Sequence, residues 1–396
     1  MTPKERMFTI SLLGLVEIFA WGSTFYLLAV LAGPIAEDTG WSPIHVTGGI
    51  SLGLLVSGIC ARKVGRLIQA TGGRKVLASG MLLIACGLAL LGFSNSIPVY
   101  LAAWCILGMG MSASLYDAAF SALGRIFGAG ARSAITALTL WGGFASTVCW
   151  PISAYLVESY GWRSTCLAYA LLHLLVMAPL CWFKLPKGDA SPRRSAETDA
   201  AETAVAAAFR VRFWCIASAG IMLAMVASVW SVHLITILTA QGYALAAAVG
   251  LGTLIGPAQV GARVLEMLGR ERHHPIWTMI SSTALVFLGF LGLQLGLPAA
   301  AALLAYGAGN GLWSIARGAL PLAVFGPRDY PVIMGRLATP TLIAAAAAPL
   351  LGSVLIDRFG ADGTLFLLTL ASVLPCLSAL LLWSDLARRR DPVPLE

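Results

Sequence analysis

Apolar segments of 18 or more residues recur along the whole chain, and only short polar turns separate most of them. A helix of that length spans ~30 Å of hydrocarbon. Only 11% of the residues are charged, whereas soluble domains carry about 25%. Short loops and the lack of ~10-residue alternating segments argue against a transmembrane barrel. We therefore expect an all-α integral membrane protein.

The apolar segments form a six-plus-six pattern. The expected spans cover residues 8–32, 43–63, 75–94, 98–124, 133–157, 162–183, 211–240, 244–268, 276–296, 298–325, 331–356 and 363–384. The first run is longer than a signal-peptide core and no A-x-A-like site closes it, so we expect it to remain as the first span. The predicted organisation is an N-terminal bundle (1–183), a polar linker (184–210), a C-terminal bundle (211–384) and a tail (385–396).

Basic residues mark one side of the membrane. Most of the 26 Lys and Arg lie in the N-terminus, the even-numbered loops or the C-terminal tail, or in the parts of the spans that adjoin them. Arg163 and Arg358 fall on the other side, and Arg317 lies within a span. Short loops rich in Lys and Arg stay cytoplasmic, so both termini are predicted to be cytoplasmic. The net charge of +8 then reflects topology and contact with anionic lipids of the bilayer. A nucleic-acid partner is not needed to explain it.

Signatures of enzymes and metal proteins are missing. All eight cysteines lie in apolar runs without C-x-x-C spacing, which argues against a disulfide framework or a zinc site. The sequence contains no H-E-x-x-H, G-x-S-x-G or P-loop motif, so we expect neither catalysis, nor a cofactor or metal, nor a built-in ATP drive.

The two halves repeat at an offset of about 200 residues. The fourth span contains "GMGMSASLYDAAFSALGRIFG" and the tenth contains "GAGNGLWSIARGALPLAVFG". Trp21 in the first span corresponds to Trp230 in the seventh, and Pro151 in the fifth to Pro349 in the eleventh. Internal repeats of this kind are typical of secondary transporters, whose substrates bind near the bilayer midplane.

One loop carries a family resemblance. The stretch "VGRLIQATGGRKVLASGM", residues 64–81, lies between spans 2 and 3. It resembles the loop of the major facilitator superfamily, Gly-x-Leu-x-Asp-Arg-x-Gly-Arg-Arg/Lys, and the similarity in span arrangement covers essentially the whole chain. The resemblance implies that this loop is a cytoplasmic gate, although a plain positive-inside loop would look similar. The predicted gate residues are Gly65, Arg66, Leu67, Gln69, Gly72, Arg74 and Lys75.

The loop departs from the family motif at three positions. Gln69 stands where the motif has Asp, and Ala70 and Gly73 stand where it has Arg. Because that Asp locks the cytoplasmic side in the family, the lock of this chain is expected to depend on helix-end packing, glycine turns and the remaining cations. The resemblance further implies a bacterial inner-membrane protein with multiple spans that acts as a monomer.

The branch of the family is not fixed by the sequence. The span-4 Arg of drug/proton antiporters is replaced by Trp104, and their span-5 G-P-x-x-G-G motif is absent from residues 150–154. The opening "AWGSTFYLLAVLAGPIAEDTGWS" is similar to monocarboxylate porters and oxalate/formate exchangers.

Polar residues within the spans are the candidate site. A charge at the bilayer centre costs roughly 2.5–3.5 kcal/mol, so it normally faces a cavity or a partner. Such residues collect in spans 1, 4, 7 and 10, which line the central cavity in the family. The predicted substrate and proton pathway is Glu17, Trp21, Thr24, Asp117, Trp230, His233, Gln259, Asn310, Trp313 and Arg317.

Three of these residues carry the chemistry. Glu17 lies near mid-membrane, where a carboxyl suits proton coupling, or it is a protonated residue bonded within the bundle. Asp117 and Arg317 occupy nearly equivalent repeat positions. They form a switchable ion pair, or a permanent structural pair, or Arg317 holds an anionic substrate while Asp117 carries a proton.

The sequence predicts a secondary active transporter that works by alternating access. The favoured substrate is a small organic anion such as a monocarboxylate, with protons or a counter-substrate as the coupled species. The alternative is proton-driven efflux of amphipathic drugs, metabolites or a metalloid. A membrane receptor or scaffold would have no reason for two repeated halves.

Overall fold

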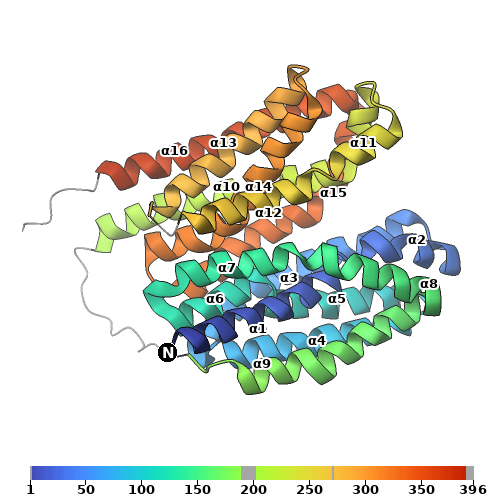
Figure 1. Cartoon of the computed structure of the whole chain (residues 1–396), viewed down its shortest axis with the longest axis horizontal. Coiled ribbons are helices and arrows are strands. Elements are labelled where there is room, and N and C mark those ends of the chain that lie inside the picture. The colour runs from blue at the N-terminus through green and yellow to red at the C-terminus, as the bar shows by residue number, and fades with distance from the viewer. Residues whose placement is uncertain (1, 189–201, 270–271, 389–396) are drawn as a thin grey trace, which may run out of the picture. The chain divides into compact units, whose positions relative to one another are not determined.

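The computed structural model describes residues 2–188, 202–269 and 272–388, and every regular element within them is helical (Figure 1). This agrees with the expected all-α class. Much of the predicted linker, at 189–201, and most of the predicted tail, at 389–396, lie outside the described residues.

The helices divide into two compact units. Unit 1 comprises Met1–Ser191 with Gly326–Ala346, and unit 2 comprises Pro192–Phe325 with Ala347–Glu396. Residues 326–346, which the sequence-based boundaries place in the C-terminal bundle, therefore pack with unit 1. The division falls inside helix α15 (Tyr330–Ala371).

Unit 1 contains α1 to α9 and the first part of α15. Its helices are α1 (Pro3–Gly22), α2 (Leu28–Thr39), α3 (Pro43–Thr71), α4 (Gly73–Gly92), α5 (Ile97–Ser114), α6 (Tyr116–Phe127), a 3₁₀ turn (Gly128–Gly130), α7 (Ala131–Gly143), α8 (Ala145–Leu172), the π-helix η2 (His173–Met177) and α9 (Ala178–Lys184). Helix α4 packs against α5, α8 and α9, and α1 packs against α7 and α8. Figure 1 shows these helices running roughly along one direction.

Unit 2 contains α10 to α14, the rest of α15, and α16. Its helices are α10 (Glu202–Ala240), α11 (Leu245–Gly252), α12 (Ile255–Leu268), α13 (Pro275–Gln294), α14 (Ala299–Phe325) and α16 (Val373–Arg388). Helix α14 packs against α12 and α13, and α16 packs against α10 and α13.

Proline and glycine set several of the helix ends. Pro43 and Pro275 begin α3 and α13, where the missing N–H removes no helical hydrogen bond. Gly72, Gly161 and Gly360 have φ of 82°, 80° and 70°, a conformation that side chains with a Cβ rarely adopt. Gly161 interrupts α8 and Gly360 interrupts α15, so each of these long elements consists of two helices.

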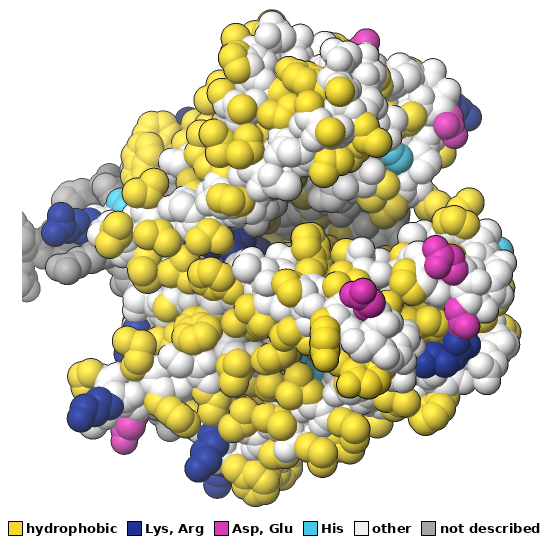
Figure 2. All heavy atoms as spheres, turned by 45° about the vertical axis from the view of Figure 1, so that its right-hand side comes forward, with side chains coloured by type: hydrophobic (Ala, Val, Ile, Leu, Met, Phe, Trp, Pro, Cys, Tyr) yellow, Lys and Arg dark blue, Asp and Glu magenta, His cyan; other side chains and the backbone are white. Residues whose placement is uncertain are grey.

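The apolar surface fits a lipid environment. Among the residues that the structure describes, seven helical stretches are long and apolar enough to cross a membrane, judged by length and composition. Two of them, Ile97–Lys184 with 88 residues and Tyr330–Arg388 with 59, are several times the ~20 residues of one crossing. Figure 2 shows hydrophobic side chains over much of the visible face. A soluble protein rarely exposes so much contiguous apolar surface.

Small residues let neighbouring helices approach closely. A Cβ on Gly110 of α5 would lie 2.8 Å from Ile84 Cγ1 and 2.9 Å from Ile84 N of α4. In unit 2, Ser282 Oγ of α13 donates to the Gly309 carbonyl of α14 at 2.7 Å. Close backbone contact and interhelical hydrogen bonds replace the hydrophobic effect between helices in lipid.

Gly110→Ala is expected to destabilise the protein by about 1–3 kcal/mol, because the added methyl group meets backbone that cannot move aside easily. The measurement is thermal unfolding in detergent. Gly33→Ala is the matched control, since a Cβ on Gly33 of α2 meets nothing within 4 Å. Equal melting temperatures for the two variants would contradict the packing argument.

A polar cluster joins three parts of unit 1 beyond the ends of the apolar spans. Arg163 forms an ion pair with Asp38 at the end of α2, and its Nη2 donates to the Ser94 carbonyl at 3.3 Å. Trp162 Nε1 donates to Asp38 Oδ2 at 3.1 Å, and the Arg163 guanidinium lies 4.3 Å from the Trp162 ring centroid. The Arg163 and Trp162 hydrogen bonds hold the pKa of Asp38 below its ordinary value.

The lowered pKa of Asp38 predicts a pH dependence of stability. The contribution of its ion pair is fully present above the unfolded pKa of about 3.9 and is lost as pH falls through the lower folded value. Unfolding measured between pH 3 and 6 should therefore show wild type and Asp38→Asn converging at the acid end. The effect should be small, because the Asp38 side chain is 48% exposed. A stability difference between wild type and Asp38→Asn that grew on acidification would contradict this prediction.

Candidate functional site

The first span of unit 1 is broken at mid-length. Helix α1 ends at Gly22, α2 begins at Leu28, and residues 23–27 form turns. The Tyr26 amide donates to the Trp21 carbonyl at 3.0 Å, one residue further back than an α-helix requires. Interrupted helices form the binding sites of many secondary transporters.

Glu17 and Trp21 lie next to this break and are bonded to each other. Trp21 Nε1 donates to Glu17 Oε2 at 2.9 Å, and the Glu17 side chain is fully buried. Thr24 lies inside the break, also fully buried, and its hydroxyl donates to the Ala20 carbonyl at 2.5 Å. The structure therefore brings Glu17 and Trp21 into contact, as their spacing of four residues allows.

The fourth span is broken as well. Leu115 separates α5 from α6 with extended φ and ψ of −76° and −177°. Asp117 is half-buried in the first turn of α6, where the helix dipole favours a negative charge. The amides of Ala118 and Ala119 both donate to the Leu115 carbonyl, which starts the new helix.

Aromatic rings connect the two breaks. The Trp21 ring centroid lies 5.0 Å from that of Tyr116, directly before Asp117. We call the connected rings the aromatic cluster; its members are Trp21, Phe25, Tyr26, Tyr116, Phe120 and Trp150. Of these rings, only Trp21 was among the predicted site residues. The others could not be found from the sequence, because only the folding of α1, α6 and α8 against one another brings them together.

In unit 2, Trp230 and His233 of α10 occupy packed positions. Trp230 is 1% exposed, and its ring lies 5.1 Å from Phe290 and 6.0 Å from Tyr306. His233 lies against α15, where a Cβ on Gly352 would be 2.7 Å from His233 Nε2. Neither residue contacts the other predicted site residues through a described hydrogen bond.

Helix α12 carries a buried cation that lies inside the expected span 244–268 and was not among the predicted site residues. Arg263 is 6% exposed, and its Nη2 lies 3.4 Å from Gln259 Oε1, one turn earlier on α12. Arg263 Nε donates to the Gly311 carbonyl of α14 at 3.5 Å. A Cβ on Gly311 would lie 2.5 Å from the Gln259 carbonyl, so this glycine allows α12 and α14 to meet.

The remaining predicted residues lie on α14, which is continuous. Asn310 and Arg317 are half-buried, and Trp313 is 9% exposed. Their spacing of three and four residues places them along one helix face. Arg317 lies eight residues before the end of α14, and Arg263 lies five residues before the end of α12.

The predicted gate residues lie at the end of α3 and the start of α4. Gln69 Nε2 donates to the Arg328 carbonyl, just before α15, at 2.8 Å. A Cβ on Gly65 would lie 2.3 Å from the Pro331 carbonyl, and one on Gly335 would lie 2.5 Å from the Ala61 carbonyl. Leu67, Arg66 and Lys75 are exposed, Arg74 is half-buried, and Gly72 forms the turn.

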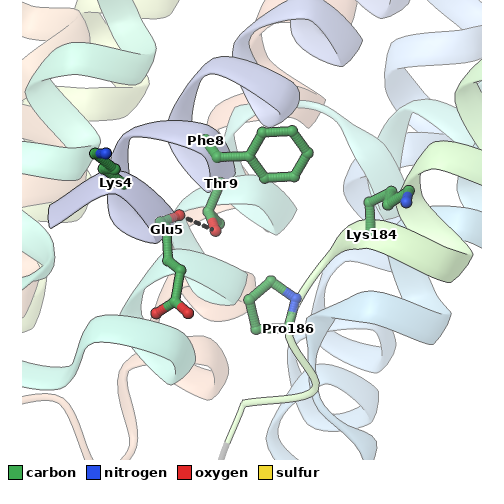
Figure 3. Close-up of a pocket in the computed structure, with 6 residues that line it drawn as sticks. All are labelled: Lys4, Glu5, Phe8, Thr9, Lys184 and Pro186. Atoms are coloured by element: carbon green, nitrogen blue, oxygen red, sulfur yellow. Dashed lines mark hydrogen bonds between the residues drawn. The ribbon is translucent and has the colours of Figure 1, made fainter. Parts of the chain in front are cut away.

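Two shallow hollows lie on unit 1. The larger, of about 590 Å³, is lined by Lys4, Glu5, Phe8, Thr9, Lys184 and Pro186 (Figure 3). It contains none of the predicted site residues. The smaller, of about 430 Å³, includes Trp150 of the aromatic cluster together with Pro151. Within the described ranges, no three His, Cys, Asp or Glu side chains gather as a metal-ligand set.

Comparison with known proteins identifies the family. A family model described as Major Facilitator Superfamily matches residues 12–329. No curated protein matches the sequence. Among solved structures, the human organic anion transporter MFSD10 (TETRAN) has a TM-score of 0.74 at 16% identity, covering 96% of this chain and 100% of its own.

Two symporters have similar folds. The E. coli fucose:proton symporter FucP has a TM-score of 0.72 at 15% identity, covering 98% of this chain and 100% of its own. The proton:xylose symporter XylE has a TM-score of 0.70 at 13% identity, covering 97% and 96%. These likenesses show the fold alone. Taken with the family match, they show a multi-pass membrane transporter of small molecules rather than an enzyme, and the chain belongs to the major facilitator superfamily.

Proposed function

We propose that this transporter moves a small organic anion, such as a monocarboxylate, by alternating access and with proton coupling. It has twelve spans, with both termini in the cytoplasm, and works as a monomer in a bacterial inner membrane. The observation that carries the proposal is the placement of four ionisable side chains within the spans. Unit 1 holds the carboxyl groups Glu17 and Asp117 at two helix breaks, and unit 2 holds Arg317 and Arg263.

The chemistry of these groups assigns their roles. A guanidinium stays charged at any physiological pH and binds a carboxylate through two parallel hydrogen bonds. Arg317, half-buried on α14, is therefore the proposed anion-binding group. Carboxyl groups can change charge when their surroundings change, so Glu17 and Asp117 are the proposed proton carriers. Thr24, Asn310, Trp313 and Gln259 supply neutral polar and aromatic contacts.

The contacts of the gate residues support a closed latch on the cytoplasmic side. The Gln69 amide bonds to a backbone carbonyl, so this contact needs no ionised group. Gly65 and Gly335 allow backbone to meet backbone beside it. In place of the family's Asp, the proposed latch thus depends on a neutral hydrogen bond and close glycine packing.

Efflux of an amphipathic cation is the second candidate, and the aromatic cluster favours it. Ring faces attract cations, and the cluster borders both Glu17 and Asp117. Arg317 has no role in recognising a cation, so its substitution separates the two proposals.

Arg317→Gln is expected to abolish anion recognition. A ligand at 100 times its Kd stabilises a protein by about 2.7 kcal/mol, so lactate or formate that binds wild type should raise its melting temperature. That shift should vanish in Arg317→Gln, along with uptake of the labelled anion into proteoliposomes. Arg317→Lys, which keeps the charge but loses the paired hydrogen bonds, is the control and should bind more weakly. Undiminished anion uptake by Arg317→Gln, or a melting shift with tetraphenylphosphonium alone, would favour the second candidate.

Proton coupling is tested separately at the two carboxyl groups. If Glu17 or Asp117 carries the proton, Glu17→Gln or Asp117→Asn should abolish uptake driven by a pH gradient while leaving anion exchange without a gradient largely intact. Proteoliposomes loaded with unlabelled anion measure the exchange. The neutral amides keep the size of each side chain, so exchange is also the control for folding. If both variants retain gradient-driven uptake, neither residue carries the proton.

A further inference from the structure

The break in the first span is attached to the π-helix of the sixth span by a buried hydrogen bond. Ser23, the first residue of the break, places its Oγ 2.7 Å from Nε2 of His173 at the start of η2. Both side chains are fully buried. Nothing in the sequence links these two residues, because they lie 150 positions apart.

The neighbouring contacts decide which atom donates. The Ser23 hydroxyl also lies 2.7 Å from the Phe19 carbonyl, which can only accept. A hydroxyl has one proton, so when Ser23 donates it to Phe19, His173 Nε2 must donate to Ser23. His173 Nδ1 is buried and has no hydrogen-bond partner among the described residues. A proton there would be an unsatisfied buried donor, which is costly. The contacts thus favour a neutral imidazole with its proton on Nε2.

The π-helix that presents His173 has a local cause. Pro179, near the start of α9, lacks an N–H, and its ring would clash with the carbonyl four residues earlier in a regular helix. The wider turn over His173–Met177 accommodates the proline, and the Ala178 amide donates to the His173 carbonyl five residues back. Such π segments occur frequently at functional sites.

Other side chains also contact the break and its flanks. A Cβ on Gly22 would lie 2.1 Å from Cys149 Sγ, so α8 lies close to the end of α1. Trp21 contacts Tyr116, and Tyr26 contacts Trp150. Because Ser23 lies between Trp21 and Phe25 in the chain, its bond to His173 restrains the backbone that carries these rings.

We propose that His173 is a positioning residue of the transport site: its Nε2–H holds Ser23 and fixes the conformation of residues 23–27. His173 acts through Ser23 and does not touch the substrate. The inference rests on the proposed function in one respect: residues 23–27 are taken to belong to the transport site. The bond itself can be tested without any substrate.

Two amide variants of His173 distinguish a hydrogen bond to Ser23 from simple packing. The Gln side chain can place its amide nitrogen where imidazole Nε2 lies, whereas the shorter Asn side chain reaches only the position of Nδ1. Amide hydrogen exchange of residues 19–30 in lipid nanodiscs, without substrate, should therefore be near wild type in His173→Gln. It should be about tenfold faster in His173→Asn and in Ser23→Ala. A peptide from α13 in unit 2 is the internal control for global unfolding.

Each result bears on the proposal. Equal exchange in the Gln and Asn variants would overturn it, as would wild-type exchange in Ser23→Ala. Nitrogen-15 NMR of the wild-type protein adds a test that needs no variant, because the proposal requires the Nε2–H form of His173, and an Nδ1–H form would overturn it. Undiminished anion uptake by Arg317→Gln, which would overturn the proposed anion site, would leave these readouts unchanged, so the two proposals can fail separately.

Discussion

Hydrogen bonding of the backbone in an apolar environment is the constraint on which this structure depends. In hydrocarbon, each unpaired N–H or C=O costs several kcal/mol, so the chain must satisfy these groups within its own segments. Every regular element of the described residues is accordingly a helix. The few places where helical bonding fails are then the informative ones, because the fold has to compensate for each of them.

Those places are concentrated in unit 1 and are compensated by side chains. At residues 23–27 the Thr24 and Ser23 hydroxyls bond to carbonyls one turn earlier, and His173 bonds to Ser23. At Leu115 the next helix begins at once, with Asp117 in its first turn. Aromatic rings fill the space beside both breaks. The proposed transport site is therefore formed where regular structure stops, and its polar residues stabilise the irregular backbone.

Four ionisable side chains within the spans carry the proposed function. The carboxyl groups of Glu17 and Asp117, which can take up and release protons, lie beside the irregular backbone of unit 1. The guanidinium groups of Arg317 and Arg263, which keep their charge, lie on α14 and α12 of unit 2, where Arg263 bonds to the Gln259 side chain.

The sequence by itself determined the helical class, the repeat and the short list of polar residues in spans, because apolar length and the cost of buried charge are local properties. It also placed Glu17 and Trp21 on one face, since four residues make one helical turn. Only the tertiary structure decided that Ser23 bonds to His173, that Tyr116 meets Trp21 and that Gln69 reaches the Arg328 carbonyl. These contacts join residues between 95 and 259 positions apart, and they depend on how helices pack, which no local periodicity encodes. Arg263 shows the same limit: it lies inside an expected span, but only the close approach of α12 to Gly311 gives it a backbone acceptor on α14.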